Sequence, residues 1–194
     1  MILASHNSWS YLTPIKWWQK LLFFTAKCQR KTIVEQYNDY NVRCFDLRIR
    51  IIDGIPYIVH NSFIYATLFS DYIMLTLSWL NDCGDVKIRI VHDVRREKDY
   101  DIFTVNTFCQ TCYNLKLQFN KIQWWCGRNL YNWKEDYHFD YQPYCSEMYS
   151  SVRPPKIIDD WIPIIYAKLN NKKILKEAEK YEEGILMIDF VDIK

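Results

Sequence analysis

Short apolar runs, which are typical of strands, alternate along this chain with longer amphipathic runs, which are typical of helices. The strand-like runs are 2–6, 42–51, 57–60, 86–94, 121–126 and 185–191. The helix-like runs are 29–40, 67–81, 101–115 and 157–182, the last expected in two pieces broken at Pro163 and at Asn170–Asn171. This order predicts an α/β fold built on a mainly parallel sheet or barrel.

The segment 127–156 fits neither pattern. It is rich in Tyr and Asp, and it ends in Pro154–Pro155. We expect a long irregular loop with a functional or capping role, inside a single domain that spans residues 1–194.

Composition and charge exclude several function classes. With only 4 glycines, and neither G-x-G-x-x-G nor G-K-[ST], the chain lacks the common nucleotide-binding loops. A net charge of +2 argues against a nucleic-acid partner, despite the short basic run at 95–98. No apolar run reaches the roughly 18 residues of a membrane span, and His6 and Asn7 interrupt the opening apolar run where a signal peptide would continue. We therefore expect a cytoplasmic protein, or one of the host cytoplasm if the source is viral.

The 7 cysteines are odd in number and scattered, which favours reduced thiols. Cys109 and Cys112 have the C-x-x-C spacing of a metal or redox pair, but no second pair or nearby histidine accompanies them. We expect no cofactor and no metal site, and a use for this pair stays open.

Two histidines stand in the same kind of place. His6 and His60 each end a short apolar strand and are each followed by Asn, and catalytic residues gather at the C-terminal ends of strands in parallel α/β folds. Between them in the sequence, Asp46 and Arg48 alternate with Phe45, Leu47 and Ile49, so one face of that strand is ionic and the other apolar. Either the ionic face forms an anion site or the pair is a structural ion pair.

Two imidazoles, a guanidinium and carboxylates suit metal-free cleavage of a phosphodiester. One neutral histidine takes a proton from the attacking hydroxyl, and a protonated one gives a proton to the leaving alkoxide. The arginine neutralises the phosphoryl oxygens, and a carboxylate, for which Asp189 near the end of the last strand is a candidate, fixes the tautomer of the base.

Three segments resemble the X-box region of phosphatidylinositol-specific phospholipase C, in its bacterial and phage-type form. They are A-S-H-N-S-W-S-Y-L (4–12), E-Q-Y-N-D-Y-N-V-R-C-F-D-L-R-I-R (35–50) and Y-I-V-H-N (57–61). The segments I-R-I-V-H-D (88–93) and I-L-M-I-D-F (185–190) fall where that family has further active-site strands. The resemblance implies a TIM (β/α) barrel, which typically needs about 250 residues, so a reduced or distorted barrel is expected here.

The resemblance also implies a role for each matching residue. His6 matches the general base, His60 the general acid, Asp189 the carboxylate that orients the base, and Asp46 the carboxylate beside Arg48. Arg48 matches the arginine that bacterial members have where eukaryotic ones hold calcium, so the implied mechanism is metal-independent. The implied reaction is attack of the inositol 2-hydroxyl on phosphorus, which gives a cyclic inositol phosphate.

Three further residues are expected to bind the substrate. Asn7 stands where bacterial members often have Asp. His92 stands where they have a head-group lysine, with Asp93 or Arg89 as alternatives for the residue that faces the site. Arg128 is a candidate second phosphate contact.

A lipid substrate raises the question of membrane contact. The segment 15–24 carries Trp17, Trp18, Phe23 and Phe24 beside lysines, as interfacial segments do, and a barrel-capping segment is the other interpretation. Two other functions stay open: a phosphodiesterase for glycerophosphodiesters or another head group, and a non-catalytic member of the fold that binds lipid or protein.

Overall fold

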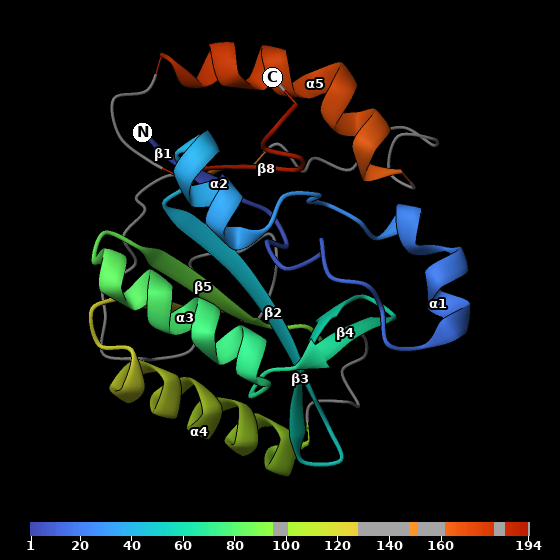
Figure 1. Ribbon diagram of the computed structural model, residues 1–194, viewed down its shortest axis with the longest axis vertical. Helices are drawn as coiled ribbons and strands as arrows, with labels where there is room; N and C mark the ends of the chain where they lie inside the picture. The colour runs from blue at the N-terminus through green and yellow to red at the C-terminus, as the bar shows by residue number, and fades with distance from the viewer. Residues whose placement is uncertain (95–100, 128–147, 151–161, 181–184, 194) are drawn as a thin grey trace.

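Parallel strands follow one another in chain order around a curled sheet. The computed structural model describes residues 1–94, 101–127, 148–150, 162–180 and 185–193 (Figure 1). The parallel strands are β1 (Ile2–Ser5), β2 (Cys44–Ile52), β5 (Lys87–His92), β6 (Gln123–Gly127), β7 (Met148–Ser150) and β8 (Ile185–Ile188). They pair in the order β6-β5-β2-β1-β8-β7, so the first strand lies beside the last. Pairing in chain order is the pattern of a (β/α) barrel, and this sheet is a reduced, distorted form of one, as the sequence predicts.

A hairpin departs from the parallel pattern. β3 (Ile55–His60) runs antiparallel to β2, and β4 (Phe63–Thr67) runs antiparallel to β3. The strand expected at 57–60 is present, but it runs antiparallel within a mainly parallel sheet, and β4 is not expected from the sequence. The reason is the turn: Asp53 and Gly54 both have positive φ, and a two-residue turn of this kind reverses the chain.

The helices lie around the sheet (Figure 1). They are α1 (Trp17–Leu21), the 3-10 helix η1 (Phe23–Thr25), α2 (Ile33–Tyr40), α3 (Asp71–Cys83), α4 (Ile102–Gln118) and α5 (Pro163–Ala178). Among the described residues, no helix has the length and apolar character needed to cross a membrane.

Two helices begin or continue differently from the expectation. α2 starts at Ile33 rather than near residue 29, because Thr32 and Glu35 form a capping box that fixes its first turn. α5 starts at Pro163 and runs unbroken through Asn170–Asn171, so the expected break there is wrong. Proline is well tolerated in the first turn of a helix, and the buried side chain of Asn171 donates to backbone carbonyls after β8.

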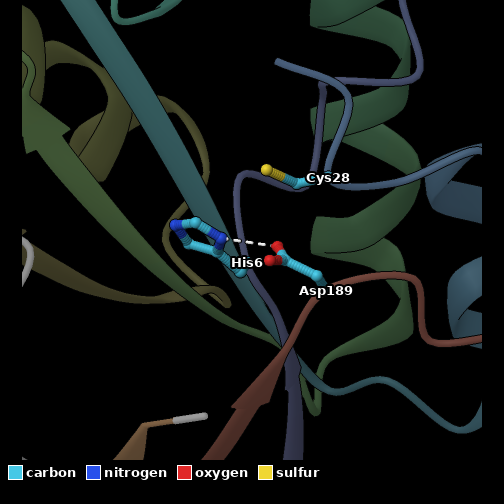
Figure 2. A group of neighbouring side chains, drawn as sticks. All are labelled: His6, Cys28 and Asp189. Carbon is cyan, nitrogen blue, oxygen red and sulfur yellow. Dashed lines mark hydrogen bonds and ion pairs between the residues drawn. The ribbon is translucent and has the colours of Figure 1, made fainter. Parts of the chain in front are cut away.

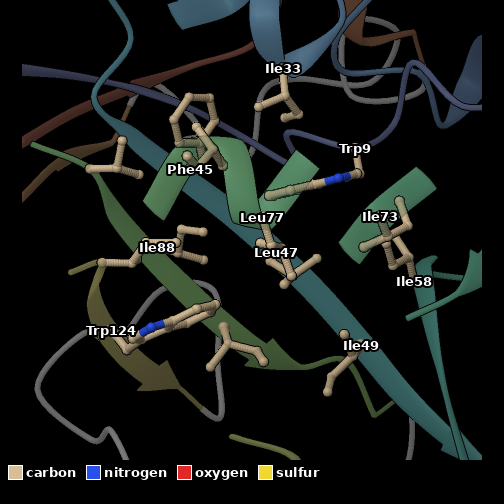
Figure 3. Packing of buried hydrophobic residues seen from close by; sticks show 14 of the residues in the cluster. Trp9, Ile33, Phe45, Leu47, Ile49, Ile58, Ile73, Leu77, Ile88 and Trp124 are labelled. Atoms are coloured by element: carbon tan, nitrogen blue, oxygen red, sulfur yellow. The ribbon is translucent and has the colours of Figure 1, made fainter. Parts of the chain in front are cut away.

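The core lies between the sheet and the helices on one side of it. Phe45, Leu47 and Ile49 are fully buried on one face of β2. They belong to a cluster that Figure 3 shows beneath α3, with labelled neighbours Ile33, Ile73, Leu77 and Ile88. The alternation in β2 thus turns its apolar side to the helices and its ionic side to the barrel interior.

Apolar side chains fill one level of the barrel interior. Ala4, Cys44 and Met187 form a small cluster there, and the strand register pairs Ala4 with both of the others. Side chains of neighbouring parallel strands at the same level share a layer, so the residues two positions further along form the next layer.

Candidate active site

The next interior layer is polar. His6, Asp46 and Asp189 lie two residues beyond Ala4, Cys44 and Met187, and Arg89 pairs with Asp46 across β2 and β5. All four are at least nine-tenths buried. The barrel therefore brings a histidine, two carboxylates and a guanidinium, from four strands or their ends, to one level.

His6 is held at both ring nitrogens. Its Nδ1 lies 2.6 Å from Asp189 Oδ1 (Figure 2). On the other side of the ring, Arg48 Nη2 lies 2.5 Å from its Nε2. A guanidinium can only donate, and a carboxylate is an acceptor, so the neutral ring carries its proton on Nδ1 and a lone pair on Nε2. A general base needs this tautomer. Its acceptor nitrogen, Nε2, faces the Arg48 guanidinium.

Asp46 binds the other side of the same arginine. Its Oδ2 accepts from Arg48 Nε at 2.9 Å and from the backbone N–H of Asn7 at 3.0 Å, and its Oδ1 lies 3.5 Å from Arg89 Nη1. Full burial alone would raise the pKa of this carboxyl, but Arg48 and Arg89 outweigh burial and lower it to about 2. Asp46 is thus a permanent anion that fixes Arg48 beside His6.

His60 faces His6 from the hairpin. The two ring centroids are 6.1 Å apart and the rings are nearly perpendicular, at 81°. Its Nδ1 donates to the Ala26 carbonyl at 2.9 Å, which leaves Nε2 as the acceptor in the neutral ring. Burial, with help from the Arg48 charge, lowers the His60 pKa to about 4.

His60 reaches the site by a different route from His6. His6 follows the C-terminal end of a parallel strand, as expected, but β3 is antiparallel to β2, so His60 returns to the level of the middle of β2. Asn7 and Asn61, which follow the two histidines, both have left-handed backbone, with φ of 46° and 53°. Asn tolerates this conformation better than most residues, which explains why Asn follows both histidines.

Asn7 lies in the site next to His6. Its side chain is buried, and its Nδ2 makes no hydrogen bond to a nitrogen or oxygen of the described residues. Its hydrogen-bond partner is the Cys28 sulfur, a weak acceptor, so the amide can exchange this partner for a stronger one.

His92 does not face the site. It pairs with Ile49, on the apolar side of β2, and its ring stacks on Phe108 of α4 at 4.5 Å. The expected contact between His92 and the substrate is therefore contradicted by its orientation. The alternatives Arg89 and Asp93 lie at alternate positions that fall on the same side of the sheet as the ionic face of β2. Asp93 accepts hydrogen bonds from Arg50 and from the Asn61 backbone N–H. Arg128 lies outside the described residues.

Two polar side chains that the sequence does not assign to the site hold the strand ends. Gln29 donates to the carbonyls of His6 and Ile188 and accepts from the Val191 backbone N–H. Asn171 donates to the carbonyl of Asp189 at 2.8 Å. Neither follows from strand or helix periodicity, because both contacts join segments far apart in the chain.

Cys28 is a third residue that the sequence does not assign to the site. Its thiol is buried, and its Sγ lies 3.9 Å from His60 Nδ1. Burial and the nearby Asp189 carboxylate raise its pKa.

The segment 15–24 both caps the hairpin and exposes aromatic side chains. Gln19 is buried and donates to the Ser62 carbonyl at 2.5 Å, and Phe23 packs against Tyr65. Trp17 is 74% exposed and Phe24 54% exposed.

Comparison with known proteins gives a structural match without a sequence match. The sequence matches no protein-family model and no curated protein. A similar solved structure is the phosphatidylinositol-specific phospholipase C from Listeria monocytogenes, with a TM-score of 0.61 and 17% sequence identity. The match covers 97% of this chain and 87% of that one. This chain shares the fold of that phospholipase C. At this identity the likeness concerns the distorted barrel, and the chemistry has to be argued from the side chains.

Proposed function

We propose that this protein is a phosphodiesterase that cleaves a phosphoinositide-type diester by general acid–base catalysis with two histidines. The observation that carries the proposal is the pair His6 and His60, with ring centroids 6.1 Å apart, beside the buried Arg48–Asp46 pair. The shared fold of a phosphatidylinositol-specific phospholipase C supports the same class of reaction.

His6 acts as the general base. Asp189 keeps the proton on Nδ1, so Nε2 is the atom that takes a proton from the attacking hydroxyl. As the imidazolium forms, the Asp189 carboxylate at 2.6 Å stabilises its charge. Arg48 turns its guanidinium from Nε2 to the phosphate when the substrate binds, which leaves Nε2 available to the hydroxyl.

Arg48 and the Asn7 amide bind the phosphoryl oxygens. The guanidinium is a strong partner for a phosphate because it offers several donors in one plane. Asp46 remains ionised and holds Arg48 at Nε while Nη2 turns to the phosphate, and the Asn7 Nδ2 supplies a neutral donor. These groups balance the negative charge on the phosphoryl oxygens in the transition state.

His60 acts as the general acid. With a pKa of about 4 in the empty site, it is neutral at pH 7 and must gain a proton before it can donate one. The phosphodiester is an anion, and an anion beside His60 offsets the charge of Arg48 and raises the pKa of the ring. Substrate binding and protonation of His60 are thus coupled, and the proton then passes to the departing diacylglycerol oxygen.

The substrate class follows from the resemblance and the exposed aromatic segment. Attack by the inositol 2-hydroxyl gives a cyclic inositol phosphate. By the resemblance, Arg48 matches the arginine that bacterial members have where eukaryotic ones hold calcium, which supports a reaction without a metal ion. Trp17, Trp18 and Phe24 are 74%, 42% and 54% exposed beside Lys16 and Lys20, and this segment contacts the lipid surface.

The test is release of water-soluble product from radiolabelled phosphatidylinositol in mixed micelles with excess chelator. Wild-type protein is expected to release cyclic inositol phosphate, and His6→Ala to release none. The matched control is His92→Leu, which removes a histidine from the opposite face of β5 and is expected to keep activity within a few-fold.

The other outcomes separate the alternatives. Product that requires added calcium contradicts the role of Arg48. No product from this lipid, but product from a panel of glycerophosphodiesters, points to another head group. No product from either substrate class contradicts catalysis and favours a binding protein.

A further inference from the structure

We propose that His6, Cys28 and Asp189 form an inhibitory binding site for a thiophilic divalent cation of the Zn²⁺ class. Metal binding is independent of the proposed function, whereas the inhibition rests on it.

The three side chains converge from separate segments of the chain. One ligand atom from each lies within 4.8 Å of the others, and Figure 2 shows Cys28 beside the His6–Asp189 pair. Their exposed fractions are 4%, 1% and 7%, so the cluster lies in the interior of the protein. Among the residues that the structure describes, this is the group of histidine, cysteine and acidic side chains that can hold a metal ion.

The donor set selects the class of cation. One sulfur, one imidazole nitrogen and one carboxylate oxygen suit Zn²⁺, whereas Ca²⁺ and Mg²⁺ prefer oxygen ligands in larger number. A thiolate and a carboxylate together carry two negative charges, which balance the cation inside the barrel. Three protein ligands also leave a fourth tetrahedral position for water.

Binding at this cluster is incompatible with the base role of His6. The available metal ligand on the ring is Nδ1, which now carries the proton that is shared with Asp189. When the metal takes Nδ1, that proton moves to Nε2, and the lone pair that should accept the substrate proton is lost. The Cys28 thiol gives up its proton to solvent as its sulfur binds the metal. The new Nε2–H faces Arg48, which displaces the guanidinium as well.

Zn²⁺ affinity is the first readout, and it does not depend on activity. Titration against a chromogenic chelator is expected to show one equivalent of tightly bound Zn²⁺ in the wild type. The affinity for this Zn²⁺ is expected to fall at least tenfold in Cys28→Ala and in Cys28→Ser. The control is the double variant Cys109→Ser/Cys112→Ser, which removes the C-x-x-C pair of α4 and is expected to leave that equivalent unchanged. Thermal unfolding without metal shows that each variant is folded, and Cys28→Ser keeps the side-chain size if Cys28→Ala does not fold.

Co²⁺ gives a second readout. A thiolate-to-cobalt charge-transfer band is expected in the wild type and in the α4 double variant, and it should be absent in Cys28→Ala. Unchanged Zn²⁺ affinity in both Cys28 variants, or a band that disappears with Cys109 and Cys112 instead, overturns the site.

Activity separates the two proposals. The expected result is that chelated wild-type protein is active, that Zn²⁺ inhibits it, and that Cys28→Ala needs at least tenfold more Zn²⁺ for the same fractional inhibition. If Zn²⁺ binds through Cys28 but activity needs it, the inhibitory role and the metal-free mechanism both fail while the site stands. If Zn²⁺ binds through Cys28 and leaves activity unchanged, the inhibition is refuted.

Discussion

Acid is expected to destabilise the protein through two buried histidines. Burial lowers the pKa of both His60 and His92 from 6.5 to about 4. The unfolded chain therefore binds protons at a pH where the folded protein still excludes them. The stability contributed by each ring is fully present above pH 6.5, and it is lost as the pH falls through the window from 6.5 to 4.

The size of the loss follows from these values. A shift of one unit corresponds to about 1.4 kcal/mol, so each ring is responsible for about 3 kcal/mol over the whole window. Between pH 7.5 and pH 5.0, where the window is only partly crossed, the expected loss is about 2 kcal/mol for each ring. Asp46, with a pKa of about 2, stays ionised in this range and adds nothing to the change.

The assay is urea unfolding at pH 7.5 and at pH 5.0 for the wild type, His92→Leu and His60→Gln. Each variant lacks one of the two titrating rings, so its free energy of unfolding should fall by about 2 kcal/mol less than that of the wild type. The difference between proteins cancels every other group that titrates in the same way in both. Equal acid losses in the wild type and both variants would refute the argument that burial keeps these rings neutral.

Three other substitutions have defined outcomes. Asp189→Asn replaces the carboxylate with a neutral amide, whose NH2 can favour the wrong His6 tautomer and which cannot stabilise the imidazolium. It should lower kcat by about 10²–10⁴-fold while phosphate binding, measured by calorimetry, is unchanged; a loss of binding instead would point to a structural role. Asp46→Asn leaves two buried guanidiniums without their anion and should cost about 3–5 kcal/mol in chemical denaturation, and a loss below about 1 kcal/mol would contradict that reasoning. The double change Trp17→Ala/Trp18→Ala should weaken binding to phosphatidylinositol vesicles by about 10-fold or more and spare hydrolysis of a water-soluble diester, and equal loss in both assays would count against surface contact.

The polar face of β2 was predictable because strand periodicity is local. Alternation of Asp46 and Arg48 with apolar residues needs no knowledge of the neighbouring strands, and the buried faces agree with it. The parallel order of the sheet followed in the same way from the alternation of strand and helix patterns.

The orientation of His92 follows from the same kind of alternation. In β5, Lys87 and Arg89 alternate with Ile88 and Ile90, and this parity places His92 on the apolar side, whereas the resemblance alone suggested a contact with the substrate. A shift of one residue reverses the face, and the register with β2 places Arg89 and Asp93, rather than His92, on the ionic side.

Contacts between distant segments account for the rest. Asp53–Gly54 is a local turn signal, but its consequence, a hairpin that returns His60 to the site, depends on how β3 pairs. Cys28 and Gln29 reach the site from the irregular segment before α2, where no periodic pattern assigns a face.

The central claim is that His6 takes a proton and His60 gives one. The most direct test compares phosphatidylinositol with an inositol diester whose leaving group is nitrophenolate, a weak base that departs without a proton donor. The account predicts that His60→Ala is impaired by about 10²–10⁴-fold on the lipid but by less than about 10-fold on the nitrophenyl ester, whereas His6→Ala is impaired on both. Equal impairment of His60→Ala on the two substrates, or activity of His6→Ala on either, would contradict the assignment.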